Sequence, residues 1–260
     1  MRLPAAGAGS LAEEGELCYT GGMKRMWIAA AAAVLLLAGC SVEKPMLAPD
    51  APVAKLPAAM CYMDTVVPHL RTDLKYAGSD NFVGRPVRGY TGRRAILGRE
   101  TAGLVAKAAR ILAAQGYGIL VWDAYRPTAA MQDFFEWSKT PDERAKPRFY
   151  PNLTKRQIYA GRYIGTLSEH SMGIAVDVTL YRLKDGREVD MGGRHDLLDA
   201  SSALDSPLVT AQQRANRRIL HDAMEAAGMK GYDKEWWHYF KPGEGPFFLY
   251  GFPLNDNLAQ

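Results

Sequence analysis

A histidine and an aspartate that could share a ligand lie in the segment SEHSMGIAVDVTL, residues 168–180. From residue 174 onward apolar and polar side chains alternate, which predicts a strand whose Asp177 points away from the aliphatic core, toward a cleft or solvent. His170 precedes Asp177 by seven positions, an odd number, so a straight strand would put the two on opposite faces. They can meet only if the chain bends around Gly173. The spacing alone leaves a purely structural role open.

A second pair of candidates lies in DKEWWHYF, residues 233–240, where the aromatic residues favour a strand. Glu235 and His238 are three positions apart, so they face the same side only if Glu235 stands at the strand entrance. A packed aromatic strand without chemistry is the alternative. Taken together, the two segments offer two histidines and an aspartate, a ligand set that suits Zn²⁺, and a glutamate that could act as a base.

Five motifs in this order resemble the D-alanyl-D-alanine dipeptidases, relatives of the zinc D-Ala-D-Ala carboxypeptidases with the hedgehog-like fold. The likeness runs from about Tyr62 to Phe252, and its motifs are DLKYAGSDNFVGRPV, VWDAYRP, SEHSMGIAVDVTL, VDMGGRHD and EWWHYF. It implies one Zn²⁺ per chain, hydrolysis of D-Ala-D-Ala to two D-alanines, and ligands His170, Asp177 and His238. Glu235 would be the general base and acid for a zinc-bound water. A D,D-carboxypeptidase or endopeptidase acting on peptidoglycan stem peptides is the alternative.

The resemblance also implies roles for three further side chains. Arg126 would stabilise the negative oxygen of the tetrahedral intermediate, Asp196 would bind the free ammonium of a dipeptide, and Ser168 would help to position the substrate. Two of these assignments compete with structural ones: Arg126 as a partner of Asp123, and Asp196 as a turn or helix-cap residue. We expect surface or packing roles for the other histidines, namely His69, His195 and His221.

The remaining pattern mixes helices and strands without a repeated βαβ rhythm, which favours an α+β fold. Helices are predicted over 99–115, 128–138 and from Thr210 to Gly228, the last with Gln213 in capping-box spacing, and a buried strand over 117–122. We therefore expect a single domain with a central antiparallel sheet flanked by helices, and the zinc site on the sheet.

The N-terminal region has the layout of an export signal. MKRMWIAAAAAVLLLAGC combines basic residues, a short apolar run and small residues, and its LAGC ending resembles a bacterial lipobox with Cys40 as the lipidated residue. We expect a mis-assigned upstream start over 1–22, a signal peptide over 23–39, a proline-rich tether over 40–60 and the catalytic domain over 61–260. Ser41 resembles the outer-membrane pattern, which predicts a periplasmic lipoprotein; a plain signal peptide with an incidental cysteine is the alternative.

Charge and cysteine content limit the partners. The formal net charge is +4 and the basic residues are spread along the chain, so no nucleic-acid groove is expected. The expected partners are a small dipeptide and the membrane that holds the lipid anchor. If Cys18 is absent from the mature protein and Cys40 carries lipid, Cys61 has no partner for a disulfide and is expected to be a small buried hydrophobe.

Overall fold

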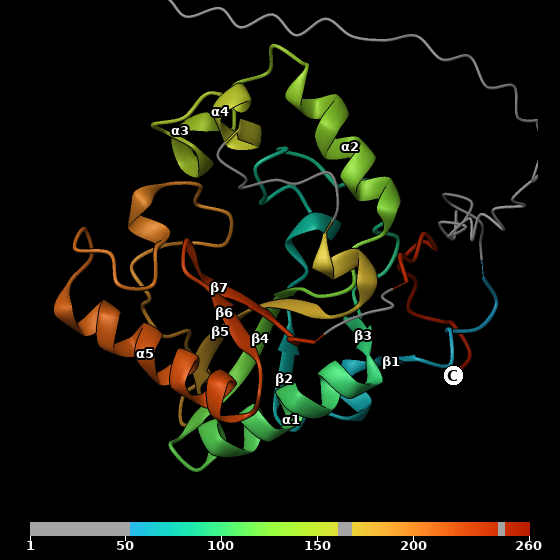
Figure 1. Cartoon of the computed structure of the whole chain (residues 1–260), viewed down its shortest axis with the longest axis vertical. Helices are drawn as coiled ribbons and strands as arrows, with labels where there is room; N and C mark the ends of the chain where they lie inside the picture. The colour runs from blue at the N-terminus through green and yellow to red at the C-terminus, as the bar shows by residue number, and fades with distance from the viewer. Residues whose placement is uncertain (1–52, 161–167, 244–247) are drawn as a thin grey trace, which may run out of the picture. The chain divides into compact units, whose positions relative to one another are not determined.

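The computed structural model describes residues 53–160, 168–243 and 248–260 (Figure 1). The expected signal peptide and Cys40 lie outside the described residues. Within the expected tether, Leu56 is buried and its N–H donates to the carbonyl of Ala259 at 2.8 Å. The last residues of the expected tether are therefore pinned by the C-terminal segment.

The main sheet has five strands in the order β2-β4-β5-β7-β6. They span Leu70–Thr72 (β2), Tyr117–Asp123 (β4), Ala175–Arg182 (β5), Glu235–Phe240 (β7) and Lys230–Tyr232 (β6). The pairs from β4 to β6 are antiparallel, as predicted, but the edge strand β2 runs parallel to β4. Two short strands, β1 (Met60–Tyr62) and β3 (Ile96–Gly98), form a separate antiparallel pair.

Two long helices, α1 (Arg99–Ala113) and α5 (Ala211–Ala226), contact each other and the strands of the main sheet (Figure 1). The capping box predicted for α5 is present: Thr210 Oγ1 accepts from the Gln213 N–H and the Gln213 side chain accepts from the Thr210 N–H. At the opposite end of Figure 1 lie the helices α2 (Thr128–Ser138), α3 (Lys146–Phe149) and α4 (Lys155–Ala160). Four short 3-10 turns complete the described part: η1 (Met63–Thr65), η2 (Lys75–Ala77), η3 (Glu169–Met172) and η4 (Ala200–Ser202).

The alternation predicted for β5 places two kinds of side chain on its two faces. Val176, Val178 and Leu180 join the hydrophobic core, while Asp177 and Thr179 point to the other face. That second face is also closed, since Asp177 is only 2% exposed. The segment between β5 and α5 contributes to this cover, for example where the ring of His195 packs against Trp122 of β4. The functional candidates therefore sit in a buried polar layer and not on an open sheet surface.

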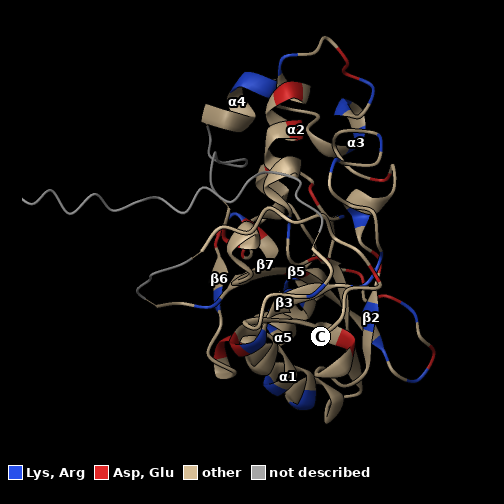
Figure 2. Cartoon of the chain, turned by 90° about the vertical axis from the view of Figure 1, so that its right-hand side faces the viewer, with Lys and Arg blue, Asp and Glu red and all other residues tan. Residues whose placement is uncertain are grey.

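The positions of basic and acidic residues are interspersed along the helices and loops (Figure 2). Within the described residues, no helix is long and apolar enough to cross a membrane. The predicted burial of Cys61 is confirmed, with 0% of the residue exposed.

Candidate metal centre and active site

A sharp bend before β5 brings His170 back toward Asp177. The turn η3 begins after Ser168, whose Oγ accepts from the His170 N–H at 3.3 Å, and ends at Gly173 with φ +70°. A side chain at Gly173 would be strained at that φ, and its Cβ would lie only 2.8 Å from Met60 Sδ. The bend predicted around Gly173 is thus present, and Ser168 has a visible structural task as the cap that orients His170.

Strand pairing supplies the third member of the group. Asp177 on β5 and His238 on β7 are directly opposite each other in the antiparallel register, so their side chains share one face. Glu235 is the first residue of β7, and the pairing with β6 shifts register beside it, between Gly231 and Tyr232. Glu235 therefore stands at the strand entrance, as its odd spacing from His238 required.

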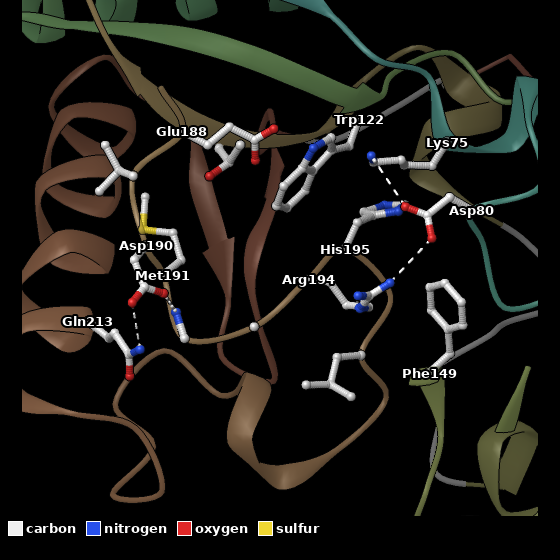
Figure 3. A pocket seen from close by; sticks show the side chains of 15 residues that line it. Lys75, Asp80, Trp122, Phe149, Glu188, Asp190, Met191, Arg194, His195 and Gln213 are labelled. Atoms are coloured by element: carbon white, nitrogen blue, oxygen red, sulfur yellow. Dashed lines mark hydrogen bonds and ion pairs between the residues drawn. The ribbon is translucent and has the colours of Figure 1, made fainter. Parts of the chain in front are cut away.

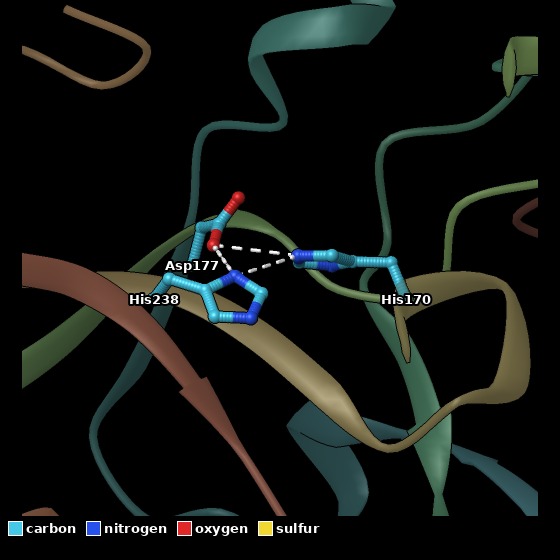
Figure 4. Close-up of side chains that lie close together, drawn as sticks. All are labelled: His170, Asp177 and His238. Atoms are coloured by element: carbon cyan, nitrogen blue, oxygen red, sulfur yellow. Dashed lines mark hydrogen bonds and ion pairs between the residues drawn. The ribbon is translucent and has the colours of Figure 1, made fainter. Parts of the chain in front are cut away.

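Three ligand atoms from His170, Asp177 and His238 converge (Figure 4). His238 Nδ1 lies 3.0 Å from Asp177 Oδ1 and 3.2 Å from His170 Nε2, and His170 Nε2 lies 3.4 Å from the same Asp177 oxygen. A tetrahedral Zn²⁺ with bonds of about 2.0–2.1 Å places neighbouring ligand atoms about 3.3–3.4 Å apart. The donor set and its spacing therefore fit Zn²⁺.

The backbone fixes which nitrogen of His170 faces this group. His170 Nδ1 lies 2.7 Å from the carbonyl oxygen of Ala124, which can only accept, so the proton belongs on Nδ1. The lone pair of a neutral His170 is then on Nε2, directed at Asp177 and His238. A hydrogen bond from the far nitrogen to a carbonyl is the usual support for a metal-binding imidazole.

Asp177 is the charged centre of the cluster. Its burial opposes ionisation, but the imidazoles of His170, His195 and His238 outweigh that cost and hold the pKa of Asp177 well below its usual range. One of these partners was not expected: His195 Nε2 lies 3.0 Å from Asp177 Oδ2. His195 is buried and packs against Trp122, so a surface role is excluded, and its contact with Asp177 comes in addition to the predicted packing role. Its place beside Asp196 in VDMGGRHD was the available signal.

Arg126 is the structural partner of Asp123 that was considered as an alternative, and it also lies beside the ligand cluster. Its Nε donates to Asp123 Oδ2 at 2.9 Å, and its Nη2 lies 3.7 Å from Asp177 Oδ2. Burial disfavours the charged guanidinium, but Tyr76 and Asp123 raise the pKa of Arg126 well above its usual value, so it stays charged. Asp123 is itself held by the hydroxyl of Tyr90, which donates to Oδ1 at 2.5 Å.

Asp196 lies in the same buried layer. Its backbone is left-handed, with φ +57°, and its Oδ2 accepts from the hydroxyl of Tyr76 at 2.7 Å and lies 3.3 Å from His195 Nδ1. Burial raises the pKa of Asp196, against the opposing effect of His195 and Tyr76. From the sequence, Tyr76 is identified only within the motif DLKYAGSDNFVGRPV. Its hydrogen bond to Asp196, 120 positions away, makes it part of the site.

Glu235 is affected both by burial and by nearby ionisable side chains. Burial raises its pKa to about 7, the nearby Asp177 and Asp196 add to the rise, and His238 opposes it. A carboxyl group with a pKa near neutrality can both accept and return a proton at physiological pH. The candidate base is therefore tuned for proton transfer by its surroundings.

A separate cavity of about 590 Å³ is lined in part by His195 (Figure 3). Trp122 and His195 line it, together with charged side chains that include Lys75, Asp80 and Arg194. His170, Asp177 and His238 are not among its lining residues. His195 thus lies between the ligand cluster and this cavity.

Comparison with known proteins agrees with the geometry. Residues 57–258 match the model of the peptidase M15 family, described as D-Ala-D-Ala dipeptidase. The chain belongs to this family. The D-alanyl-D-alanine dipeptidases of Enterococcus faecium and Streptomyces coelicolor are each 39% identical over 195 residues, which cover 74% of this chain and 96% of theirs. A solved structure of the D,D-pentapeptidase VanY in complex with Zn(II) covers 57% of this chain and 74% of its own, at 19% identity and a TM-score of 0.34. This likeness is too low to carry an argument.

Proposed function

We propose that this family member is a zinc-dependent D-alanyl-D-alanine dipeptidase. The observation that carries the proposal is the convergence of one atom each from His170, Asp177 and His238 in a buried layer that also holds Glu235. The similar D-alanyl-D-alanine dipeptidases support D-Ala-D-Ala as the substrate, since this chain aligns with nearly their whole length. The donor set of two imidazoles and one carboxylate favours Zn²⁺, one ion per chain.

The protein's own groups divide the work of hydrolysis. When bound, Zn²⁺ would supply a Lewis acid that polarises the substrate carbonyl and lowers the pKa of water. Glu235, with its pKa near 7, accepts a proton from the attacking water and returns it to the leaving amine. Arg126, which stays charged, donates hydrogen bonds to the carbonyl oxygen as negative charge develops there. One water is consumed and two D-alanines result.

Asp196 supports a free dipeptide as the substrate. Asp196 is 6% exposed, and its backbone conformation and the Tyr76 hydroxyl hold its carboxylate in place. A buried carboxylate pairs with an ammonium group, and a longer peptide has an amide nitrogen at that position, which carries no charge. The proposed role of Ser168 is indirect, through the orientation of His170.

Hydrolysis of three compounds tests this substrate class. D-Ala-D-Ala should be cleaved with a kcat/KM at least about tenfold above that of N-acetyl-D-Ala-D-Ala, since a charge-assisted hydrogen bond contributes about 1.5–3 kcal/mol and 1.4 kcal/mol is tenfold. A pentapeptide stem should be a poor substrate for the same reason. Equal rates on the stem or the acetylated compound would favour the D,D-carboxypeptidase or endopeptidase alternative.

We further propose that the mature protein is a periplasmic lipoprotein, anchored through Cys40 to the outer membrane. The support is the sequence pattern LAGC after a short apolar run, followed by Ser41. Wild-type protein expressed in a Gram-negative host should incorporate labelled palmitate and partition with membranes, and Cys40→Ala should release it. Unlabelled wild-type protein found wholly in the soluble fraction would refute the anchor.

A further inference from the structure

His195 lies between two carboxylates in the buried layer. Its Nε2 is 3.0 Å from Asp177 Oδ2, and its Nδ1 is 3.3 Å from Asp196 Oδ2. Only the contact of Nε2 with Asp177 is a hydrogen bond. Nδ1 makes no hydrogen bond among the described residues. The residue is 2% exposed, so this hydrogen bond is buried.

The two oxygens of Asp177 have different neighbours. Oδ1 faces the two candidate ligand histidines, with His238 Nδ1 at 3.0 Å and His170 Nε2 at 3.4 Å. Oδ2 faces His195, and Arg126 Nη2 is farther away at 3.7 Å. A carboxylate can rotate about its Cβ–Cγ bond, and the hydrogen bond at Oδ2 opposes that rotation.

We infer that His195 is a positioning residue for the metal centre: its Nε2–H holds Asp177 so that Oδ1 is presented to the metal. This inference rests on the proposed zinc-dependent function. It extends the site beyond its direct ligands, since hydrogen-bond partners of metal ligands fix the ligand's orientation and strengthen metal binding.

The His195 ring is itself held from several sides. Its centroid lies 5.6 Å from those of Trp122 and Tyr76 and 5.9 Å from that of Trp237. These contacts direct Nε2 at Asp177 and leave the ring little freedom. They also define the competing explanation, in which His195 serves only as an aromatic filler of this pocket.

Two substitutions separate the two explanations. His195→Phe keeps an aromatic ring among Trp122, Tyr76 and Trp237 but has no N–H for Asp177. His195→Gln packs less well, but its side-chain amide can place an N–H near the position of Nε2. Positioning predicts that the glutamine variant keeps metal better than the phenylalanine variant, and packing alone predicts the reverse.

The measurement is the zinc dissociation constant of each folded variant, obtained by competition with a chelator. His195→Phe should bind Zn²⁺ about 10–100-fold more weakly than wild type. His195→Gln should recover most of that loss. His221→Phe makes the same change at a half-buried histidine that is paired with Glu225 on α5, and it should leave the dissociation constant unchanged. His195→Leu provides a second variant without a ring N–H should the phenylalanine variant not fold.

The outcomes also separate this inference from the function on which it rests. Unchanged zinc affinity in His195→Phe or His195→Leu, beside a wild type that binds zinc and cleaves D-Ala-D-Ala, overturns only the role of His195. A glutamine variant that binds zinc more weakly than the phenylalanine variant does the same. A wild type that binds no zinc overturns the proposed function and this inference with it.

Discussion

Replacing Glu235 by glutamine should stabilise the metal-free protein at alkaline pH while it removes turnover. The folded chain raises the pKa of Glu235 from 4.5 to about 7, chiefly through burial. Below pH 4.5 the group is protonated in both the folded and the unfolded chain, so its stabilising contribution is complete there. As the pH rises from 4.5 to about 7, the unfolded chain releases this proton while the folded chain keeps it, so the contribution is lost progressively and is absent above about pH 7.

The size of the effect follows from the same values. A rise from 4.5 to about 7 corresponds to about 3.4 kcal/mol at 1.36 kcal/mol per pKa unit. Glu235 is only partly buried by exposed area, so water screens some of this cost and we expect about 2 kcal/mol. Glutamine has nearly the same shape and cannot ionise, so it avoids this cost.

Urea unfolding of zinc-free wild type and Glu235→Gln at pH 4.5 and pH 8 measures this difference. The free energy of unfolding of the variant, relative to wild type, should rise by about 2 kcal/mol between the two pH values. In the zinc-loaded state the same variant should keep its metal and lose a factor of about 10²–10⁴ in kcat. A stability difference that is the same at both pH values, or near-normal turnover, would refute the assignment of Glu235 as the tuned base.

Three further substitutions test the rest of the site. His238→Ala should lower the metal content from about one zinc per chain to a small fraction by elemental analysis, and stoichiometric zinc in this variant would contradict the ligand set. Asp196→Ala should reduce the preference for D-Ala-D-Ala over its N-acetyl form, mainly by slowing cleavage of the free dipeptide; an unchanged ratio would place the ammonium elsewhere. Asp123→Asn should lower kcat/KM about tenfold or more, because Arg126 loses the charge-assisted hydrogen bond that orients it. Full activity in steady-state assays would show that Arg126 needs no such support.

Local signals in the sequence predicted the elements that they specify directly. The capping residues of α5 and the alternation of β5 are properties of adjacent residues, and the structure has both. Two residues an odd number of positions apart on a regular strand point to opposite faces. The sequence therefore showed that a bend at Gly173 and a position of Glu235 at the start of its strand were required for these side chains to meet, and the structure has both. The motif resemblance then supplied what spacing left open.

Contacts between distant segments could not be predicted in this way. The hydrogen bonds of Tyr76 with Asp196, Tyr90 with Asp123 and His195 with Asp177 form only because the tertiary fold brings distant segments together. None of these pairs has a fixed sequence spacing. The parallel edge strand β2 and the pinning of Leu56 by Ala259 have the same origin, since both depend on partners far along the chain.

The most direct test of the central claim is the release of D-alanine from D-Ala-D-Ala by the purified chain, measured after chelation and again after addition of one equivalent of Zn²⁺. The account predicts no turnover in the chelated protein, restoration by about one zinc per chain, and no restoration in His170→Ala or His238→Ala. Turnover that persists in the chelated protein, or a zinc-loaded wild type that leaves D-Ala-D-Ala intact, would contradict it.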